Sequence, residues 1–526
     1  MEFDQLELDT ITPLQLKRYL KDKFVVVASN RGPVEFRKVP GGQVKPFRGA
    51  GGVVTAMSTA LTATDAIWLS AARTAEDRLK AQEAKRGRIG LPEDDPQYWV
   101  KFVTPEKDEY EGYYNTISNN LLWYMQHYMW DIPRVPVIDE ATYEAWSQGY
   151  RKVNRLFAER ILEEIKRTDK KPLIFLQDYH LYLCAHYIRR RAPEVLIHHF
   201  THSPWTQPDY LRLLPLRMRK ELMQGILAND IVGFHTQRYA SNFIWCCQEG
   251  DAVRVSVNAK TRSVSYAGRE VLVRHYPISV DHETLKKRAA SEDVRRYREQ
   301  IRGLAGSRKL LVRVDRVELS KNIVRGLLAY RTFLRDHPEW RDRVMFANFI
   351  YPSRETLKEY RDYRRAIEEL VREINVEFGG PDWVPTYMDI EDNYPRSLAG
   401  LMEFDALLVN PVFDGMNLVA KEGAVVNERN GVILLSVNAG AYMEMRETVL
   451  AINPLDVQET AAMIHRALAM PARTREKMAR RAREVVEENT SFKWLLRQIQ
   501  DLRRVERQHA PKETPVDQHV SFLDRI

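Results

Sequence analysis

The sequence is poor in cysteine and has no long apolar run. Its three cysteines, Cys184, Cys246 and Cys247, lack the spacing of metal ligands, and the adjacent pair is not placed to form a disulfide. This usage favours a reducing compartment, so we expect a cytoplasmic protein. No run of about 18 apolar residues is present, and the start has no basic-then-apolar pattern. We therefore expect neither a membrane span nor a signal peptide.

A strong charge of one sign is also missing. The formal net charge is +8 over 526 residues, and basic residues are interleaved with acidic ones, as in 473–489. Nucleic-acid binding calls for a segregated basic surface with aromatic residues, which this sequence does not show. Basic residues gathered in a cleft that binds phosphorylated small molecules would explain the positive net charge equally well. We expect no nucleic-acid partner and no membrane partner.

Apolar runs divide the chain into two halves, since it is too long for one typical core. Strands are expected at 24–29, 66–71, 173–177, 195–200, 230–236 and 271–278, and after the middle of the chain at 309–314, 344–350, 384–389, 406–411, 432–436 and 449–454. Helical patterns lie at 142–167, 181–191, 283–303, 456–470, 472–488 and 491–508. Short apolar strands alternating with helices indicate an α/β fold with parallel sheets.

These patterns predict the domain boundaries. We expect an extension over 1–23, a first α/β domain over 24–276, a second over 282–490, a helix over 491–508 and a tail over 509–526. A loop rich in glycine and proline follows the first strand and closes with the glycines at 49–52. Two similar α/β halves imply a cleft between them, with ligands bound outside the carboxyl ends of the strands.

Polar side chains follow six of the expected strands. They are Arg31, Asp178, His202, Arg316, Arg354 and Asp414. A single polar residue at a strand end is more often a helix cap or a loop contact than a ligand-binding residue. A charged or polar residue at each of these six strand ends favours a binding site. Arg316 and Lys321 bring a guanidinium fork and an ammonium group five residues apart, which suits a diphosphate. Gly49, Gly51 and Gly52 lack side chains and could approach the same ligand closely.

The stretch 405–428 joins a buried strand to a helix that begins near Asn417. Free N–H groups and partial positive charge at a helix start favour an anion. Asp414 precedes that start, where its carboxylate can cap the helix or hold a ligand hydroxyl. Glu422 lies four residues after Leu418 and faces the same side, placed to accept a hydrogen bond from a ribose. No Walker A sequence is present, and no GxGxxG opens a helix after the first strand, so kinase and dehydrogenase interpretations lack support.

Eight motifs together resemble the trehalose-6-phosphate synthase family of retaining, sugar-nucleotide-dependent glycosyltransferases. They are SNR at 29–31, GG at 51–52, YYNTISNNLLW at 113–123, DYHL at 178–181, His-x-Pro at 202–204, RVELSK at 316–321, PSR at 352–354 and DGMNLVAKE at 414–422. The similarity runs from about residue 24 to 505, and the nine-residue match is the most specific.

This resemblance implies two Rossmann-like domains facing across a cleft, the GT-B arrangement, with the last helix crossing back to the first domain. It implies transfer of glucose from a nucleotide diphosphate glucose, with UDP-glucose favoured, to glucose 6-phosphate. The product would be α,α-trehalose 6-phosphate. The acceptor hydroxyl would attack the anomeric carbon on the same face from which the diphosphate leaves, and the departing phosphate would take the proton of that hydroxyl. No cofactor and no metal are implied.

By position, the resemblance also assigns roles. Donor binding falls to Gly51, Gly52, His202, Arg316, Lys321, Asp414, Gly415, Met416, Asn417, Leu418, Val419 and Glu422. Acceptor binding falls to Arg31, Trp68, Tyr114, Trp123, Asp178 and Arg354, the two arginines and Tyr114 gripping the phosphate. Catalytic roles fall to Asp178, His202, Arg316 and Lys321, with Asp178 and His202 positioning hydroxyls rather than acting as nucleophiles. A glycoside hydrolase would need two carboxylates flanking the bond, and we assign no such pair.

Departures from the family pattern leave alternatives open. Gln177 replaces a histidine, Ala71 a second tryptophan and Glu318 an aspartate, and HSPWT replaces HIPFP. The alternatives are a different donor base or acceptor, as in glucosylglycerol-phosphate synthases or pseudoglycosyltransferases. A non-catalytic regulatory homologue would have lost Arg316, Lys321 or Glu422, and all are present. No phosphatase signature follows residue 490, so we expect no fused phosphatase. The sequence leaves open whether the chain forms a homo-oligomer.

Overall fold

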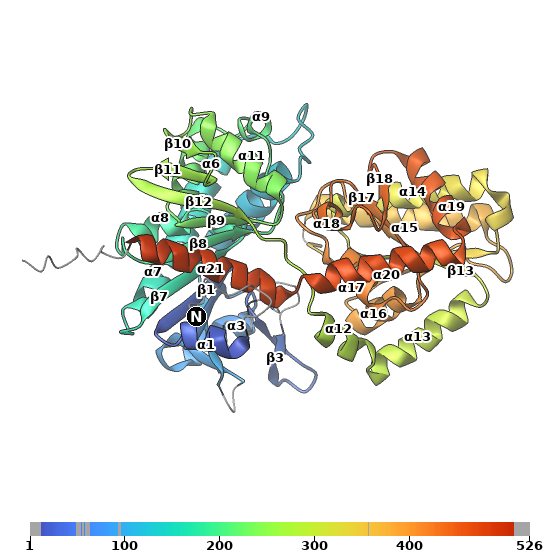
Figure 1. The fold of residues 1–526 in the computed structure, drawn as a ribbon, viewed down its shortest axis with the longest axis horizontal. Helices are drawn as coiled ribbons and strands as arrows, with labels where there is room; N and C mark the ends of the chain where they lie inside the picture. The colour runs from blue at the N-terminus through green and yellow to red at the C-terminus, as the bar shows by residue number, and fades with distance from the viewer. Residues whose placement is uncertain are drawn as a thin grey trace, which may run out of the picture.

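The computed structural model describes residues 12–48, 54, 57, 61, 64–92, 96–355 and 357–509. Gly49, Gly51 and Gly52, the start of the predicted extension and most of the predicted tail lie outside these residues. The described chain forms two α/β lobes, each built on its own sheet (Figure 1). The predicted α/β class and its two sheets of largely parallel strands are therefore confirmed.

The first sheet is centred on β1 (Lys23–Ser29). Its order is β10 (Ser256–Asn258), β11 (Ser263–Tyr266), β12 (Arg269–His275), β9 (Ile231–Phe234), β8 (Leu196–Thr201), β7 (Lys171–Gln177), β1, β4 (Ala66–Ala71), β6 (Tyr98–Val103), β5 (Ile89–Leu91). The strands from β12 to β6 pair in parallel, and the outer pairings are antiparallel. The chain builds outward from β1 in both directions, so the carboxyl ends of β1 and β7 border a topological switch point.

The second sheet is wholly parallel and is built in the same way from β13 (Lys309–Arg316). Its order is β15 (Thr386–Ile390), β14 (Val344–Tyr351), β13, β16 (Ala406–Val409), β17 (Val432–Ser436), β18 (Leu450–Ile452). Counted from β13, this is the 3-2-1-4-5-6 order of dinucleotide-binding folds. Its switch point lies between β13 and β16.

Helices cover the sheets and alternate with the strands. In the first lobe they are α1 (Pro13–Tyr19), α3 (Ala75–Glu83), η3 (Lys85–Gly87), α4 (Lys107–Glu111), η4 (Gly112–Leu122), α5 (Trp123–Gln126), α6 (Glu140–Glu144), η5 (Ala145–Arg151), α7 (Lys152–Ile165), η6 (Tyr179–Leu181), α8 (Cys184–Arg189), α9 (Pro208–Leu211), α10 (Leu216–Ile226) and α11 (Gln237–Gln248). In the second they are α12 (His282–Ala289), α13 (Glu292–Ala305), η7 (Leu319–Lys321), α14 (Ile323–Asp336), η8 (Pro338–Trp340), α15 (Lys358–Phe378), α16 (Tyr394–Glu403), α17 (Leu418–Val426), α18 (Tyr442–Met445), α19 (Val457–Ala469) and α20 (Ala472–Glu488).

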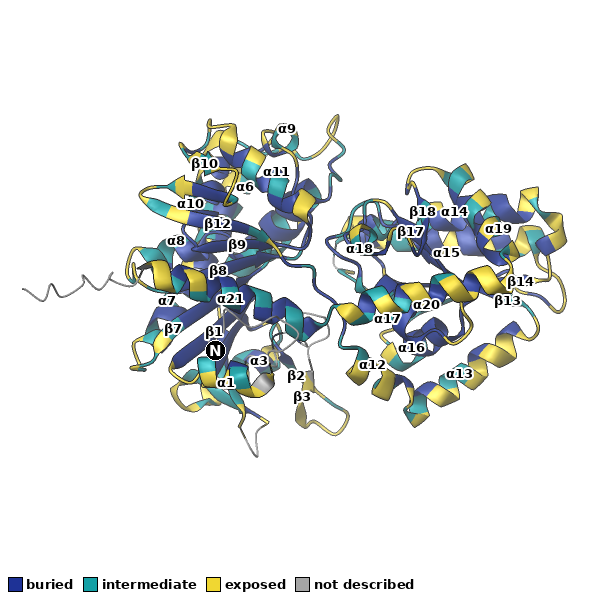
Figure 2. Ribbon diagram, viewed as in Figure 1, coloured by how far each residue is buried: buried dark blue, intermediate teal, exposed yellow. Residues whose placement is uncertain are grey.

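The strands form the core because they are apolar on both faces. Every residue of β1, β4 and β17 is buried, as expected for parallel strands covered by helices on each side. Figure 2 shows β1 as buried, whereas α13 and α20 expose one face to solvent. Within the residues that are described, no helix has the length and apolarity needed to cross a membrane.

Two π-helical segments, η4 and η5, cross at a pair of glycines. A Cβ on Gly149 would lie 2.6 Å from the backbone nitrogen of Tyr113 and 2.9 Å from Cα of Gly112. Only glycine permits so close an approach of two backbones. The crossing fixes η4 against α7 and the first sheet, and η4 carries Tyr114.

Several sequence predictions need correction. The helix predicted over 283–303 is two helices, α12 and α13, because Ser291 is extended and starts a new helix. The predicted loop after β1 contains a hairpin, β2 (Val34–Lys38) and β3 (Val44–Arg48), which turns at Gly41 and Gly42 with φ of 93° and 84°. The helix predicted over 181–191 is shorter, and the one over 142–167 contains the π-helical η5. The three cysteines are free and buried.

The last helix, α21 (Ser491–His509), packs on the first lobe although α20 belongs to the second (Figure 1). Trp494 is fully buried, and its ring lies 5.1 Å from that of Phe200 on β8. Tyr276 donates a hydrogen bond of 2.7 Å to Asp501. The chain thus crosses between the lobes twice, after β12 and before α21.

Candidate active site

The six strand-end residues named from the sequence all line one cavity of ≈ 310 Å³. It also takes in Trp68, Tyr114, Trp123, Lys321 and Gly415, so that eleven of the predicted site residues meet there. Arg31 and Asp178 follow β1 and β7 at the switch point of the first sheet. Arg316, the last residue of β13, and Asp414, which follows β16, lie at the switch point of the second. The cavity therefore lies where two switch points face each other.

Close contacts between the lobes enclose this cavity. The hydroxyl of Tyr239 donates to the backbone oxygen of Asp414 at 3.0 Å. A Cβ on Gly415 would lie 1.7 Å from the carbonyl oxygen of His202, so a glycine is needed for this approach. Lys421 on α17 donates to the carbonyl of Ile278 at 2.9 Å, beside the first crossing.

One side of the cavity gathers arginines around Tyr114. Burial alone would raise the pKa of this phenol, but Arg31, Arg354 and Arg73 lower it to about 8. Tyr114 also stacks on His180, with ring centroids 5.9 Å apart. Three guanidinium groups around one buried hydroxyl form a strongly anion-attracting surface. A phosphate group suits it.

Arg354 joins this surface from the second lobe. Its backbone has φ of 44°, an uncommon value for a residue with a side chain. Its guanidinium lies 4.9 Å from the ring centroid of Trp123 and donates a hydrogen bond to Tyr360. Burial acts to lower the Arg354 pKa, but Tyr179 and Glu318 raise it overall, so the side chain stays charged. Residues of both lobes therefore build this part of the site.

Arg316 also lines the cavity and is half-exposed, with 52% of its side chain accessible. Its Nε lies 3.3 Å from a carboxylate oxygen of the buried Glu318. Burial acts to raise the Glu318 pKa, but Arg316, Arg354 and Lys321 lower it to about 2. Glu318 is therefore ionised at neutral pH and is held by cations on several sides.

Lys321 ends η7 and forms an ion pair with Asp414, with Nζ 2.6 Å from Oδ2. Burial acts to lower the Lys321 pKa, but Asp414 and Asp315 raise it. Asp414 does not cap α17, which was one of its two predicted uses. The cap is Asn417, whose side chain accepts from the backbone nitrogen of Ala420 at 3.2 Å. The helix start predicted near Asn417 is confirmed.

Asp178 lies at the end of β7 with φ of 67°, again unusual for a residue other than glycine. Its carboxylate accepts from the backbone nitrogen of His202 at 3.2 Å. Burial raises its pKa to about 6, although backbone hydrogen bonds from Tyr179, His202 and Ser203 oppose the rise. A carboxylate fixed by backbone amides is suited to orienting a hydroxyl of a sugar.

His202 is engaged within the protein at both ring nitrogens. Nε2 lies 2.9 Å from the amide oxygen of Gln177, and Nδ1 lies 3.2 Å from Nε2 of His235. Burial and the neighbouring His235 lower its pKa well below the usual value, so the ring is neutral. Gln177, which replaces a histidine of the family pattern, thus supplies a hydrogen-bond partner that holds His202 in place.

Only the first part of 414–422 reaches the cavity lining, through Asp414 and Gly415. Met416 and Asn417 are buried, and Leu418 and Val419 are partly buried at the start of α17. Glu422 does not line the cavity. Burial raises its pKa to about 7, and its charge acts on Tyr351 and Tyr394.

Sequence reasoning missed two groups around the cavity. Arg73 follows β4 as Arg31 follows β1, so its position after a strand was an available signal. His127 lines the cavity, with Nδ1 2.8 Å from the carbonyl oxygen of Trp123, and burial lowers its pKa to about 4. No motif in the sequence marks His127, because η4 and α5 bring it there only in the folded chain.

The cavity carboxylates have partners in the protein: cations for Glu318 and Asp414, and backbone amides for Asp178. Within the described ranges, one cluster of side chains has metal-ligand character, and it lies at the far end of α14 from the cavity. The cavity lining combines cationic, acidic, aromatic and small polar side chains.

Comparisons with known proteins identify relatives of this chain. The family described as Glycosyltransferase family 20 matches residues 22–504. An alpha,alpha-trehalose-phosphate synthase [UDP-forming] of Aspergillus niger is 30% identical over 482 residues, covering 90% of this chain and 95% of the relative.

Two solved structures are also similar in fold and sequence. One is described as trehalose-6-phosphate from E. coli bound with UDP-2-fluoro glucose, with a TM-score of 0.79 and 26% identity over 91% of this chain and 99% of that one. The other is a UDP-forming alpha,alpha-trehalose-phosphate synthase from Burkholderia xenovorans in complex with glucose-6-phosphate. Its TM-score is 0.78, and it is 25% identical, with 91% of this chain and 100% of that chain covered. These neighbours support the predicted GT-B architecture.

Proposed function

The chain belongs to glycosyltransferase family 20, and we propose that it transfers glucose from UDP-glucose to glucose 6-phosphate, giving α,α-trehalose 6-phosphate with retention of configuration. One observation carries the proposal. Cationic side chains of both lobes, Arg31 of the first and Arg316, Lys321 and Arg354 of the second, line one cavity. Two anionic groups on two substrates need two sets of cationic side chains, with the reacting carbon between them.

We assign the leaving diphosphate to Arg316 and Lys321. When the bond from the anomeric carbon to the diphosphate breaks, negative charge grows on the leaving oxygen. Cations already in position stabilise that charge without rearrangement, which is the main source of rate enhancement in many enzymes. The ion pair with Asp414 holds Lys321 at the switch point before substrate arrives. Asp414, Gly415 and the start of α17 then face the sugar and its phosphates.

We assign the acceptor phosphate to Arg31, Arg354 and Tyr114. The stack of Arg354 on Trp123 fixes the guanidinium plane, which favours bidentate contact with phosphate oxygens. Trp68 and Trp123 supply apolar walls for the sugar, and Asp178 orients its hydroxyls. Holding two reactants at contact distance removes much of the entropic part of the barrier.

The bond changes follow from this placement. The bond between the anomeric carbon and the diphosphate oxygen breaks, and a bond to the anomeric oxygen of glucose 6-phosphate forms on the same face. The proton of that hydroxyl passes to the departing phosphate oxygen. A hydrolytic mechanism would need two free carboxylates, whereas Glu318 and Asp414 are each paired with a cation. We expect no metal requirement, so a chelator should leave the rate unchanged.

A substrate panel tests the proposal. UDP-, GDP- and ADP-glucose are each combined with glucose 6-phosphate, glycerol 3-phosphate or glucose, and products are identified by mass and by NMR of the anomeric configuration. We expect UDP-glucose and glucose 6-phosphate to give the α,α-linked product. Nucleotide release that does not depend on glucose 6-phosphate would contradict the acceptor assignment. Product formed only with another base or acceptor would favour the related transferases, and no turnover with any pair would favour a regulatory homologue.

A further inference from the structure

A cluster of two histidines and a glutamate lies at the carboxyl end of α14, remote from the cavity. His337 follows α14, Glu339 lies in η8, and His465 comes from α19, which packs against α14. Lys321 lies two residues before the other end of this 14-residue helix. At 1.5 Å per residue, the cluster is about 20 Å from Lys321. It therefore takes no part in the reaction proposed above.

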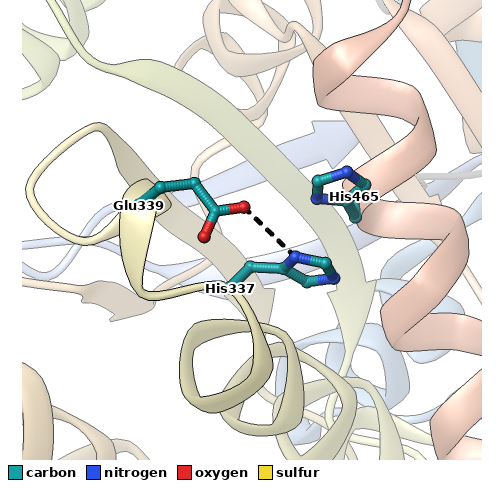
Figure 3. Close-up of side chains that lie close together, drawn as sticks. All are labelled: His337, Glu339 and His465. Atoms are coloured by element: carbon teal, nitrogen blue, oxygen red, sulfur yellow. Dashed lines mark hydrogen bonds and ion pairs between the residues drawn. The ribbon is translucent and has the colours of Figure 1, made fainter.

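The three side chains converge, as Figure 3 shows. The rings of His337 and His465 stack with centroids 3.8 Å apart and planes at 20°. Nδ1 of His337 lies 3.2 Å from a carboxylate oxygen of Glu339. One ligand atom from each residue lies within 4.8 Å of the other two. A cation bound at about 2.1 Å needs its ligands roughly 3–3.5 Å apart, so the three side chains must draw closer together when it binds.

The surroundings hold the two rings in place. The fully buried Phe333 lies 5.7 Å from the His337 ring and 6.4 Å from that of His465. Trp340, also buried, contacts His465 edge-on at 6.3 Å. These contacts keep the two rings close together. Because the rings lie face to face, their in-plane lone pairs run nearly parallel, and the rings must tilt apart for both to bind one cation.

One nitrogen of the cluster lacks a partner in this structure. Nδ1 of His465 is buried and has no hydrogen bond with any described residue. Buried polar atoms without a partner are uncommon, and each calls for an explanation such as a bound ion. Neutral imidazole is the form that binds a metal.

We propose that His337, Glu339 and His465 form a binding site for a divalent transition cation of the Zn²⁺ class. Two imidazole nitrogens and one carboxylate oxygen are ligands that Zn²⁺ and its neighbours accept, whereas Mg²⁺ and Ca²⁺ prefer oxygen alone. Three protein ligands leave a coordination position for water. The bound cation links η8 to α19 and stabilises the second lobe, because it binds the folded chain in preference to the unfolded one.

Binding and unfolding measurements on the full chain test this site. The protein is treated with EDTA, desalted, and titrated with ZnCl2 by calorimetry, and its thermal unfolding is followed with and without Zn²⁺. We expect one Zn²⁺ per chain and a Tm raised by about 2–4 °C. MgCl2 at the same concentration should leave Tm unchanged. Co²⁺ in place of Zn²⁺ should give visible absorption bands from nitrogen ligation.

Two variants and a control make the result specific. His465→Gln should lose Zn²⁺ binding, the Tm shift and the Co²⁺ bands, and Glu339→Gln should weaken all three. Glu339 is exposed, so its variant tests the site even if the His465 variant folds poorly. His186→Gln replaces a half-buried histidine on α8 and should bind as the parent does. Zn²⁺ binding that persists in both cluster variants, or an equal shift with Mg²⁺, would overturn the proposal. These readouts do not depend on glucosyl transfer.

Discussion

Lys321 and Asp414 are 93 positions apart in the sequence, and in the folded chain Lys321 Nζ lies 2.6 Å from Asp414 Oδ2. One residue follows β13 and the other follows β16, so this ion pair spans the switch point of the second sheet. The pairing keeps the lysine charged and directs it into the cavity before any ligand is present. Its removal therefore tests the donor side of the site directly.

We expect Lys321→Ala to lower kcat/KM by about 30- to 1000-fold, or about 2–4 kcal/mol of transition-state stabilisation. The loss arises because the leaving diphosphate is no longer compensated and Asp414 is left unpaired. Steady-state kinetics measure it. Lys358→Ala is the matched control, because that lysine is 78% exposed on α15 and should have no effect. Near-normal turnover in Lys321→Ala would remove this lysine from the donor site.

Arg354→Ala tests the acceptor side. We expect KM for glucose 6-phosphate to rise by about 10- to 100-fold, the equivalent of a lost hydrogen bond to a charged group. KM for UDP-glucose should change far less, because Arg354 lies with Arg31 and Tyr114. Initial rates with each substrate varied in turn separate the two constants. Arg365→Ala, at a side chain 74% exposed, is the control. Equal increases in both constants would argue against separate donor and acceptor sides.

Tyr114 predicts a pH dependence of acceptor binding. Its pKa is about 8, so the phenol is neutral below that pH and becomes a phenolate above it. A phenolate repels the acceptor phosphate and neutralises the arginines that attract it. KM for glucose 6-phosphate should therefore rise as pH increases through 8. In Tyr114→Phe this rise should be absent. An identical pH profile in the two proteins would assign the titration to another group.

Substitution of Gln177 tests whether its hydrogen bond holds the His202 ring in place. Gln177→Leu leaves Nε2 of His202 buried without its partner, which should lower the free energy of unfolding by about 1–3 kcal/mol. Urea unfolding measures this change, and kcat should fall with it as the ring loses its orientation. Gln177→His keeps a polar partner and should recover most of the stability. A leucine variant as stable as the histidine variant would show that the contact contributes little.

The sequence predicted the fold class and much of the site because both depend on local patterns. Short apolar strands between helices indicate parallel sheets, and the carboxyl ends of such strands meet at one edge. Residues at or just after the ends of strands, such as Arg31, Asp178 and Arg316, could therefore be grouped without coordinates. The helix start near Asn417 could also be predicted, because it depends on a local sequence pattern. The roles of these residues in binding stay predictions.

Tertiary structure decided what depends on distant segments meeting. The crossing of η4 and η5 at two glycines places Tyr114 among the arginines, and no local pattern predicts it. Glu422 does not line the cavity, although its helix does begin at one edge. His337 and His465 are separated by 128 positions and meet only because α14 packs on α19. Local apolar periodicity determined the strands and their ends, whereas side-chain pairing was set by packing between elements far apart in sequence.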